Sequence, residues 1–440
     1  MKPVLGIILE FGYHESKKYI HSGFARKAAE KFNLVWFYIN KDNQYFNSLF
    51  EGTGSPLIEI DIRTLRRNPS DIEVKNNAVR RAWMVSKNLG SFHNYRVVNR
   101  RTLKTILLGT NRLKNFYEKR ALKEIATLYV SPYLLQLFKE NGIQHVLSTG
   151  YSSALSKAVF VTAKSGGIKT WYLVNSWKDL YVNNFVPFDF LNGIFVWSKD
   201  MEVNYKKHMP YLRNTDFIVS GNPTFDALLQ HECIKSKSDY ASKYGLNKSA
   251  KWVIYTLMPP GINNNEIETI KLVARVLRNK YSTDEVVILL RLNPNHNKNH
   301  FKDLEMPDNV VFMEHYCTYD KQKDLIIQSK EGEYEWLDML HYSDLNFSVP
   351  STVTLEFLAL NKPILNIGFG PDGRLFEPLL QHFEAGFYKK LFTENPLVKK
   401  VLKIDDILVT FEEVAGLVVE TEKHSVKTKL ANDKIISHIS

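Results

Sequence analysis

Residues 342–370 read YSDLNFSVPSTVTLEFLALNKPILNIGFG, and this stretch decides the fold. Its order of apolar and polar residues predicts a strand, a tight polar turn, a helix and a second strand. Ser351 and Thr352 fall where the helix begins, and Glu356 follows one turn later. A helix N-terminus has unpaired N–H groups and a partial positive charge, so it attracts an anion without a lysine. The pattern therefore predicts a phosphate and sugar site at the start of this helix.

The same alternation of strands and helices continues on both sides of this stretch. Helical spacing at 22–32 lies between apolar strands, and the same holds for 265–280. This βαβ order predicts an α/β protein with parallel sheets covered by helices on both faces. The segments with strand character are 3–11, 34–39, 145–150, 171–174, 194–197, 217–221, 252–258, 286–292 and 309–313.

The chain length and one polar stretch predict the division into domains. A chain of 440 residues exceeds one ordinary core, so two domains are expected. The hydrophilic run that follows GNPTFDAL marks the boundary between them. We predict an N-terminal domain at 1–228, a linker at 229–250, a C-terminal domain at 251–404, and helices at 405–440 that pack back on the N-terminal domain. Two such domains predict a cleft between them.

Composition narrows the class of protein. Hydrophobic residues make up 44% and charged residues 24% of the chain, as in a globular protein. No apolar run approaches the ~20 residues of a membrane span, and Glu10 and His14 interrupt the first run, which we interpret as a strand and not a signal peptide. Cys233 and Cys317 are the only cysteines, which excludes a disulfide framework and a CxxC metal site. The expected location is the cytoplasm.

Positive charge is concentrated in one block. The formal net charge is +11, and residues 61–130, which lack strand alternation, hold 16 Lys or Arg against 5 Asp or Glu. Residues 74–117 contain no acid, so we predict a basic helical insert that binds an anionic membrane surface. Nucleic acid, a diphosphate-bearing substrate and a merely solvated helix face are alternatives, but no nucleic-acid recognition motif is present. The residues expected to contact the membrane include Arg80, Arg81, Arg100, Arg101 and Lys104.

Residues 174–229 carry aromatic, polar and small side chains in a distinctive order: Ser176, Trp177, Asp179, Trp197, Gly221, Asn222, Pro223, Phe225 and Asp226. Together with 289–294 and 348–365, this order resembles the GT-B glycosyltransferases of bacterial surface polysaccharide (capsule and lipopolysaccharide) biosynthesis. The resemblance covers about residues 145–370. CDP-glycerol glycerophosphotransferases and UDP-N-acetylglucosamine epimerases share parts of the pattern.

The resemblance implies two facing Rossmann-like domains with an interdomain cleft. The C-terminal domain would hold a nucleotide-sugar donor, and the N-terminal domain would hold a glycan or lipid-linked acceptor. The implied reaction is metal-independent, inverting transfer of a sugar to a cell-surface glycan, with no cofactor besides the donor, at the periphery of the inner membrane. The relatives leave open a nucleotide-sugar epimerase or a CDP-polyol phosphotransferase. A basic RNA-binding or scaffold protein is the non-enzyme alternative.

The resemblance assigns a role to the helix start within residues 342–370. Ser351 and Thr352 match the positions that hold the donor diphosphate, and Glu356 matches the acidic residue that contacts the ribose hydroxyls. A departing diphosphate must be stabilised, and without a metal this falls to helix N-termini, Arg and Lys.

Three further residues are candidates for the donor site. Arg291 ends a buried strand, where a guanidinium is costly unless it meets an anion, so we expect a phosphate ligand there. Asn293 stands where the family usually has the histidine of His-Pro, and His296 follows within a polar run. Gly261 lies in MPPGINNNE, which is either a phosphate loop or a plain turn. No DxD motif occurs, and no acid accompanies the histidines of HNKNH, so no metal is expected.

An inverting transfer needs a base that accepts the proton of the acceptor hydroxyl. Glu10, His14 and Glu15 follow the first strand in LEFGYHES, and in related folds this loop often carries the base. Asp179 in SWKD is the other candidate. A lone histidine in a loop is also commonly just solvated.

Overall fold

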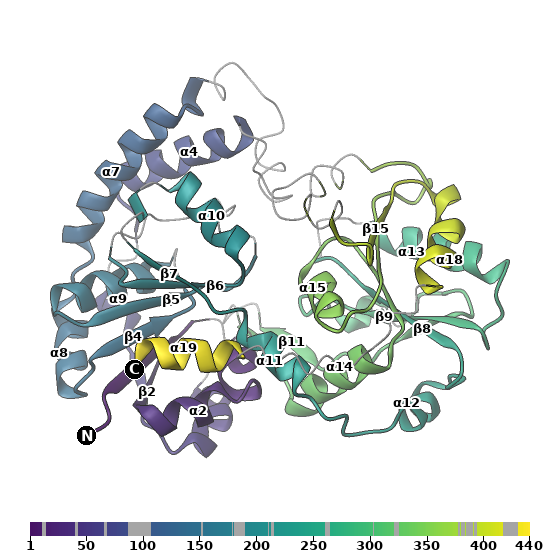
Figure 1. Cartoon of the computed structure of the whole chain (residues 1–440), viewed down its shortest axis with the longest axis horizontal. Helices are drawn as coiled ribbons and strands as arrows, with labels where there is room; N and C mark the ends of the chain where they lie inside the picture. The colour runs from purple at the N-terminus through teal and green to yellow at the C-terminus, as the bar shows by residue number, and fades with distance from the viewer. Residues whose placement is uncertain are drawn as a thin grey trace. The chain divides into compact units, whose positions relative to one another are not determined.

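A computed structural model of the chain forms two compact units, Met1–Ala227 with Thr428–Ser440, and Leu228–Lys427 (Figure 1). The division falls at the end of the predicted N-terminal domain, but residues 229–250 are not a linker: they belong to the second unit and contain the helix Lys237–Tyr244, whose Tyr240 and Ala241 lie in that unit's core. The structure describes all residues except 11–14, 40–42, 66–67, 87–106, 151–152, 178, 180–189, 210, 213–214, 260–264, 302, 321–324, 377–378, 380–382, 384–389, 391–393 and 417–429.

The first unit is built on a sheet of parallel strands in the order β3-β2-β1-β4-β5-β6-β7. Apolar side chains face both sides of this sheet, as expected where helices cover both faces. The register places Leu5 of β1 opposite Leu34 of β2 and His145 of β4. The strands are β1 (Val4–Leu9), β2 (Asn33–Ile39), β3 (Leu57–Ile60), β4 (His145–Ser148), β5 (Lys169–Leu173), β6 (Gly193–Val196) and β7 (Asp216–Val219).

Several helices of this unit begin at hydroxyl caps. Ser131 caps one helix whose first residue is Pro132, and Ser153 caps the next. Each hydroxyl accepts a backbone N–H that the helix leaves unpaired. The helices are α2 (Phe24–Lys31), α3 (Asn43–Phe50), α4 (Asp71–Ser86), α7 (Asn111–Leu128), α8 (Pro132–Glu140), α9 (Ala154–Ser165), α10 (Lys199–His208), α11 (Pro223–Leu229), which crosses into the second unit, and α19 (Ala431–Ile439).

The described part of the basic insert is a pair of packed helices, α4 and α7 (Figure 1). Arg80 of α4 is fully buried and lies 2.8 Å from Glu118 of α7, which also pairs with Lys114 at 2.8 Å. The expectation that Arg80 faces a membrane is therefore wrong: its acidic partner is 38 residues away in the chain and holds it inside the unit. Arg100, Arg101 and Lys104 lie outside the described residues.

The second unit repeats the plan with a parallel sheet in the order β10-β9-β8-β13-β14-β15. An antiparallel hairpin, β11 (Cys317–Asp320) with β12 (Leu325–Gln328), stands apart from it. The sheet strands are β8 (Lys251–Thr256), β9 (Val286–Arg291), β10 (Val310–Phe312), β13 (Leu345–Ser348), β14 (Ile364–Ile367) and β15 (Val398–Val401). The helices are α12 (Lys237–Tyr244), α13 (Glu266–Arg278), α14 (Lys330–Tyr342), α15 (Thr352–Ala359) and α18 (Ile407–Ala415).

The two C-terminal helices belong to different units. Helix α18 packs on the second sheet through Ile407 and Phe411, and α19 packs on α2 in the first unit. The carboxylate of Asp226 accepts the backbone N–H groups of Ala431 and Asn432 at 3.0 and 2.8 Å, where α19 begins. Asp226 therefore has a structural role: it fixes the start of the last helix.

Candidate functional site

The carboxyl ends of parallel strands share one edge of a sheet, and ligands of such folds bind where the strand order reverses. In the first unit this switch point lies between β1 and β4, because β2 and β3 extend to one side of β1 and β4 to β7 extend to the other. The residues at this point are Glu10, directly after β1, and Thr149 and Gly150, directly after β4.

Glu10 is buried at this switch point and lies against the N-terminus of α9. Its Oε1 accepts the hydroxyl of Ser153, the N-cap of α9, at 2.7 Å and that of Ser156 at 2.9 Å. A helix N-terminus stabilises a negative charge, so this position favours the carboxylate. The predicted base thus occupies the anion site of the first unit.

Gly150 is required for this arrangement. A Cβ at position 150 would lie 2.0 Å from Oε2 of Glu10 and 2.6 Å from Oγ of Ser156. We expect Gly150→Ala to displace Glu10 and to lower the free energy of unfolding by about 1–3 kcal/mol, as overpacking does, measured by urea denaturation. Gly52→Ala is the control, because a Cβ there meets nothing within 4 Å. Equal stability of the two variants would contradict this account.

Glu15 and Lys18 extend the polar cluster: Glu15 precedes the short π-helix Ser16–His21, and Lys18 lies within it. Glu15 accepts the backbone N–H of Glu10 at 2.7 Å and the hydroxyl of Thr149 at 3.3 Å. Lys18 is buried and donates to the side-chain and backbone oxygens of Asn175. Burial lowers the pKa of Lys18 to about 8, although Asp179 and Glu15 act in the opposite direction. An amine with such a pKa can release or accept a proton near neutrality.

Asp179, the other candidate base, holds the loop after β5. Its Oδ2 accepts the hydroxyl of Tyr172 at 2.9 Å and the backbone N–H groups of Asn175 and Ser176 at 2.8 and 3.0 Å. Burial raises its pKa, and these hydrogen bonds act against the rise. The carboxylate thereby positions Asn175, the partner of Lys18.

The switch point of the second unit lies between β8 and β13, and α15 begins there. Ser351 is the N-cap: its hydroxyl accepts the N–H of Val353 at 3.3 Å, and its own N–H donates to Thr354 at 3.4 Å. Thr352 is the first residue of the helix, and Glu356 is buried one turn later. The stretch at 342–370 therefore forms the strand, turn, helix and strand that its pattern predicts.

A buried polar network fixes the start of α15 against the sheet. Thr354 lies 3.3 Å from the amide oxygen of Asn366 in β14. Asn346 in β13 donates to the carbonyl of Ile254 in β8 at 3.0 Å and accepts the hydroxyl of Ser348 at 2.7 Å. All these side chains are buried, and their hydrogen bonds hold the helix start over the sheet edge, while Nδ2 of Asn366 has no hydrogen-bond partner among the described residues.

The two switch points differ in one respect that concerns ligands. In the first unit, β1 ends in Glu10, which lies against the helix N-terminus. In the second unit, β8 is followed at the corresponding place by Leu257 and Met258, and neither side chain is anionic. The second unit therefore supplies no carboxylate from β8 to the start of α15.

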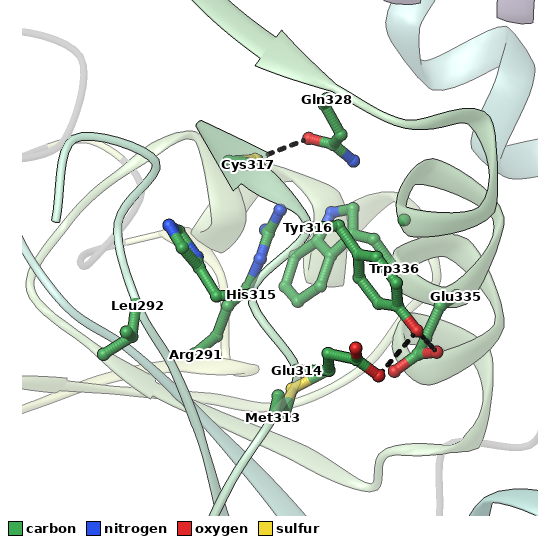
Figure 2. A pocket seen from close by; sticks show the side chains of 11 residues that line it. Arg291, Leu292, Met313, Glu314, His315, Tyr316, Cys317, Gln328, Glu335 and Trp336 are labelled. Carbon is green, nitrogen blue, oxygen red and sulfur yellow. Dashed lines mark hydrogen bonds between the residues drawn. The ribbon is translucent and has the colours of Figure 1, made fainter. Parts of the chain in front are cut away.

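Arg291, at the end of β9, lines a small recess that is partly open to solvent; we call it the Arg291 recess. Its guanidinium lies 3.4 Å from the ring centre of Trp336 (Figure 2). The hydroxyl of Tyr316 donates to Glu335 at 2.8 Å on the opposite wall. An Arg plane stacked on an aromatic ring beside carboxylates and hydroxyls suits a polar or planar group. The other lining residues are Leu292, Met313, Glu314, His315, Cys317, Gln328 and Gly332.

The predicted residues around the β9 loop have local partners. The backbone N–H of Asn293 donates to Nδ1 of His296 at 3.1 Å, and the side chain of Asn293 accepts the N–H of Asn295 at 3.1 Å. These contacts close the turn after β9. Gly261 and His14 lie outside the described residues.

Glu266, which sequence reasoning did not single out, is buried after the loop that follows β8. It accepts the N–H of Met258 at 2.9 Å and the hydroxyl of Tyr255 at 3.2 Å. Burial raises its pKa to about 8, and both hydrogen bonds oppose the rise. The folded protein therefore holds one proton more than the unfolded chain between about pH 4.5 and pH 8, and this group's contribution to stability falls as the pH rises through that window.

We expect Glu266→Gln to remove this dependence. The unfolding free energy of the unchanged protein should fall relative to the variant by up to about 1.4 kcal/mol per pH unit between pH 5 and 8, measured by denaturant titrations. Glu268→Gln, which alters an exposed partner of Lys271, is the matched control. Parallel pH profiles for the unchanged protein and Glu266→Gln would refute the assignment.

Among the described residues, one group of side chains has the donor types of a metal site. Its ligand atoms, from His231, Cys233 and Asp338, lie within 4.8 Å of one another. Asp338 already accepts His231 at 2.5 Å, two backbone N–H groups and the hydroxyl of Tyr240. A metal would have to displace the His231 contact, because two ligands of one ion lie farther apart than a hydrogen bond of this length.

Sequence reasoning also missed Lys18, Trp336 and Glu335. In the sequence, Lys18 is an ordinary lysine in a polar run, and nothing nearby indicates that it is buried. Its partner Asn175 is 157 residues away. Trp336 and Glu335 both line the recess from α14, and no local sequence pattern marks them.

No family model matches the chain, and no curated protein matches its sequence. Solved structures do match it in fold. The UDP-GlcNAc 2-epimerase from Methanocaldococcus jannaschii has a TM-score of 0.53 at 14% identity, with 94% of this chain and 93% of that chain covered. A putative UDP-N-acetylglucosamine 2-epimerase from Listeria monocytogenes has a TM-score of 0.53 at 12% identity, covering 99% and 91%.

A third match is the UDP-GlcNAc 2-epimerase from Neisseria meningitidis bound to UDP-GlcNAc, with a TM-score of 0.51 at 13% identity, covering 94% of this chain and 91% of that chain. Identities this low compare folds. They confirm the predicted two-domain GT-B architecture, with a parallel α/β sheet in each unit. The narrower resemblance to surface-polysaccharide glycosyltransferases finds no counterpart in these matches.

Proposed function

We propose that this protein is an enzyme that binds a nucleoside-diphosphate sugar through its second unit and epimerises the sugar. One observation carries the assignment of the diphosphate: the start of α15 lies at the switch point of the second sheet, where β8 supplies no carboxylate, whereas Glu10 lies against the corresponding helix in the first unit. A rigid helix N-terminus without a protein anion from that strand suits a diphosphate.

The other contacts to the nucleotide follow from chemistry and position. Ser351 and Thr352 offer hydroxyl and backbone donors at the helix start, and Glu356 is the candidate for the ribose hydroxyls. Arg291, at the carboxyl end of β9 in the same sheet, offers a cation on an aromatic support. Gly261 and Asn293 stay candidates for further contacts to the nucleotide, from the loops that follow β8 and β9.

The first unit contains the groups that we propose remove and return the proton. Epimerisation removes a proton from one face of a carbon and returns a proton to the other, so it needs a base and an acid. Glu10 is a held carboxylate, and Lys18, whose pKa is lowered to about 8 by burial, can supply a proton. His14 and Asp179 are the other groups predicted for this role. No step of the proposal needs a metal.

The neighbours' reaction supports epimerisation over transfer, since three proteins of this fold are described as UDP-GlcNAc 2-epimerases. Glycosyl transfer to a cell-surface glycan is the second candidate. It is favoured by the order of residues at 174–229 and by the exposed basic face of α7, which suits a membrane-borne acceptor.

The experiment is to incubate the protein with UDP-, CDP-, GDP- and dTDP-sugars in D₂O without an acceptor and to follow the sugar by NMR. Epimerisation predicts a new epimer that carries deuterium at the inverted carbon. A donor that turns over only when a glycan is added would replace epimerisation by transfer. If no nucleotide raises the melting temperature, although a ligand at 100 times its Kd stabilises by about 2.7 kcal/mol, nucleotide-sugar binding itself is wrong.

A further inference from the structure

The outward side of α7 combines positive charge with exposed apolar side chains. Glu118, Lys114, Ala121 and Ile125 face the protein and are buried. The opposite side carries Arg112, Lys119, Arg120 and Lys123, all exposed, together with Phe116; we call these five residues the α7 face. They recur at spacings of three and four residues, so they lie along one side of the helix.

The charges of the α7 face are not neutralised locally. None of its four cations forms an ion pair with another described residue, and the guanidinium of Arg120 lies 5.6 Å from the ring centre of Phe116. Helix α7 has two acidic residues. Glu118 forms the buried ion pairs with Arg80 and Lys114, and Glu124 is half-buried. The helix therefore presents a purely basic exposed side.

Exposed large apolar side chains are frequent in the stretch of chain that contains α4 and α7. Phe116 is 51% exposed and Leu107 is 60% exposed. Val74 on α4, and Leu128 and Val130 at the end of α7, belong to the same set. Half of the large hydrophobic residues that are exposed in the described part of the chain thus belong to this insert, which makes it distinct from the rest of the surface.

We propose that the α7 face docks on the surface of an anionic phospholipid bilayer. Basic side chains are attracted to anionic headgroups, and apolar side chains between them gain from burial at the boundary with the acyl chains. A nucleic acid would satisfy the charges but offers no apolar phase for Phe116, which lies among the basic residues of the α7 face. None of the described helices is long and apolar enough to cross a bilayer, so the contact is a surface contact.

The structure changes which residues carry this contact. Arg80 and Lys114 belong to the basic block by sequence but are buried with Glu118, so they do not contribute. The docking proposal does not rest on the proposed reaction, because α7 shares no described residue with the switch points of either sheet.

Vesicle flotation tests the proposal, with neutral phosphatidylcholine vesicles and vesicles that contain one third phosphatidylglycerol. The protein should float with the anionic vesicles, less so at high salt. The quadruple variant Arg112→Gln, Lys119→Gln, Arg120→Gln and Lys123→Gln should lower the partition coefficient at least tenfold, since each basic residue near the surface contributes roughly fivefold. Phe116→Ser should lower it severalfold with the charge unchanged.

The matched control neutralises four exposed lysines elsewhere, Lys31, Lys139, Lys248 and Lys403, and should float like the unchanged protein. Equal losses in both quadruple variants would reduce the effect to net charge and overturn the α7 face. So would failure of the unchanged protein to float, or RNA binding that the α7 variant loses without any vesicle binding. Because nucleotide binding should be unaffected in every variant, failure here leaves the proposed reaction to its own test.

Discussion

Glu10→Gln is expected to lower kcat on the nucleotide sugar by about 10²–10⁴-fold, the usual contribution of a positioned base. The amide is isosteric and can still accept from Ser153 and Ser156, so the loss should come from the missing charge and not from unfolding. Steady-state kinetics, with the melting temperature as the check on folding, would measure it.

Glu59→Gln is the control, because Glu59 is an exposed acid of β3 in the same sheet. It should leave kcat within about twofold, as a surface change far from the switch point does. A Glu10→Gln protein with unchanged kcat would transfer the role of base to His14, Glu15 or Asp179.

The second large effect concerns stability. Glu118→Gln leaves Arg80 and Lys114 buried without their counter-charge, and we expect the unfolding free energy to fall by about 3–5 kcal/mol. Denaturant unfolding at neutral pH measures this. Glu140→Gln, which alters an exposed acid of α8 that accepts from Gln136, should change stability by less than about 1 kcal/mol.

A triple variant distinguishes two causes of this loss: the buried charges left without a partner, and the removal of the ion pairs themselves. Arg80→Met, Lys114→Met and Glu118→Leu together remove all three charges, and replacement of a buried ion pair by apolar side chains is often neutral. We expect this protein to regain most of the lost stability. If Glu118→Gln alone is as stable as the unchanged protein, the three side chains are more hydrated than their burial indicates.

The alternation of strands and helices is a local pattern, and it predicted a parallel sheet in each half of the chain, although it did not mark β3, β15 or the β11–β12 hairpin. It also placed Glu10 directly after the first strand and Ser351 at the start of a helix, as the structure has them. The partners of these residues are different. Ser153 and Ser156 reach Glu10 from more than 140 residues away, and no spacing within one segment announces that contact.

Which charged side chains are buried and which are exposed was the hardest feature to predict from the sequence. A lysine or arginine on a helix looks the same in sequence whether it meets water or a buried acid, and Arg80 meets an acid 38 residues later. Lys18 gives the same lesson, since its lowered pKa comes from burial by distant segments. The structure was needed to identify the outward basic side of α7, because the sequence does not show that Glu118 pairs with Arg80 and Lys114 and leaves the other cations of the helix exposed.

The central claim is that the start of α15 holds the diphosphate, and calorimetric titration of UDP into Thr352→Glu tests it most directly. An acid in the first turn of a helix stabilises the helix by about 0.3–1 kcal/mol but repels an incoming anion. Lys330→Gln, which makes the start of α14 in the same unit more negative by one charge, is the control. We predict a Kd for UDP at least tenfold higher in Thr352→Glu, with an unchanged or higher melting temperature and with control affinity equal to that of the unchanged protein. Unaltered affinity in Thr352→Glu would contradict the account.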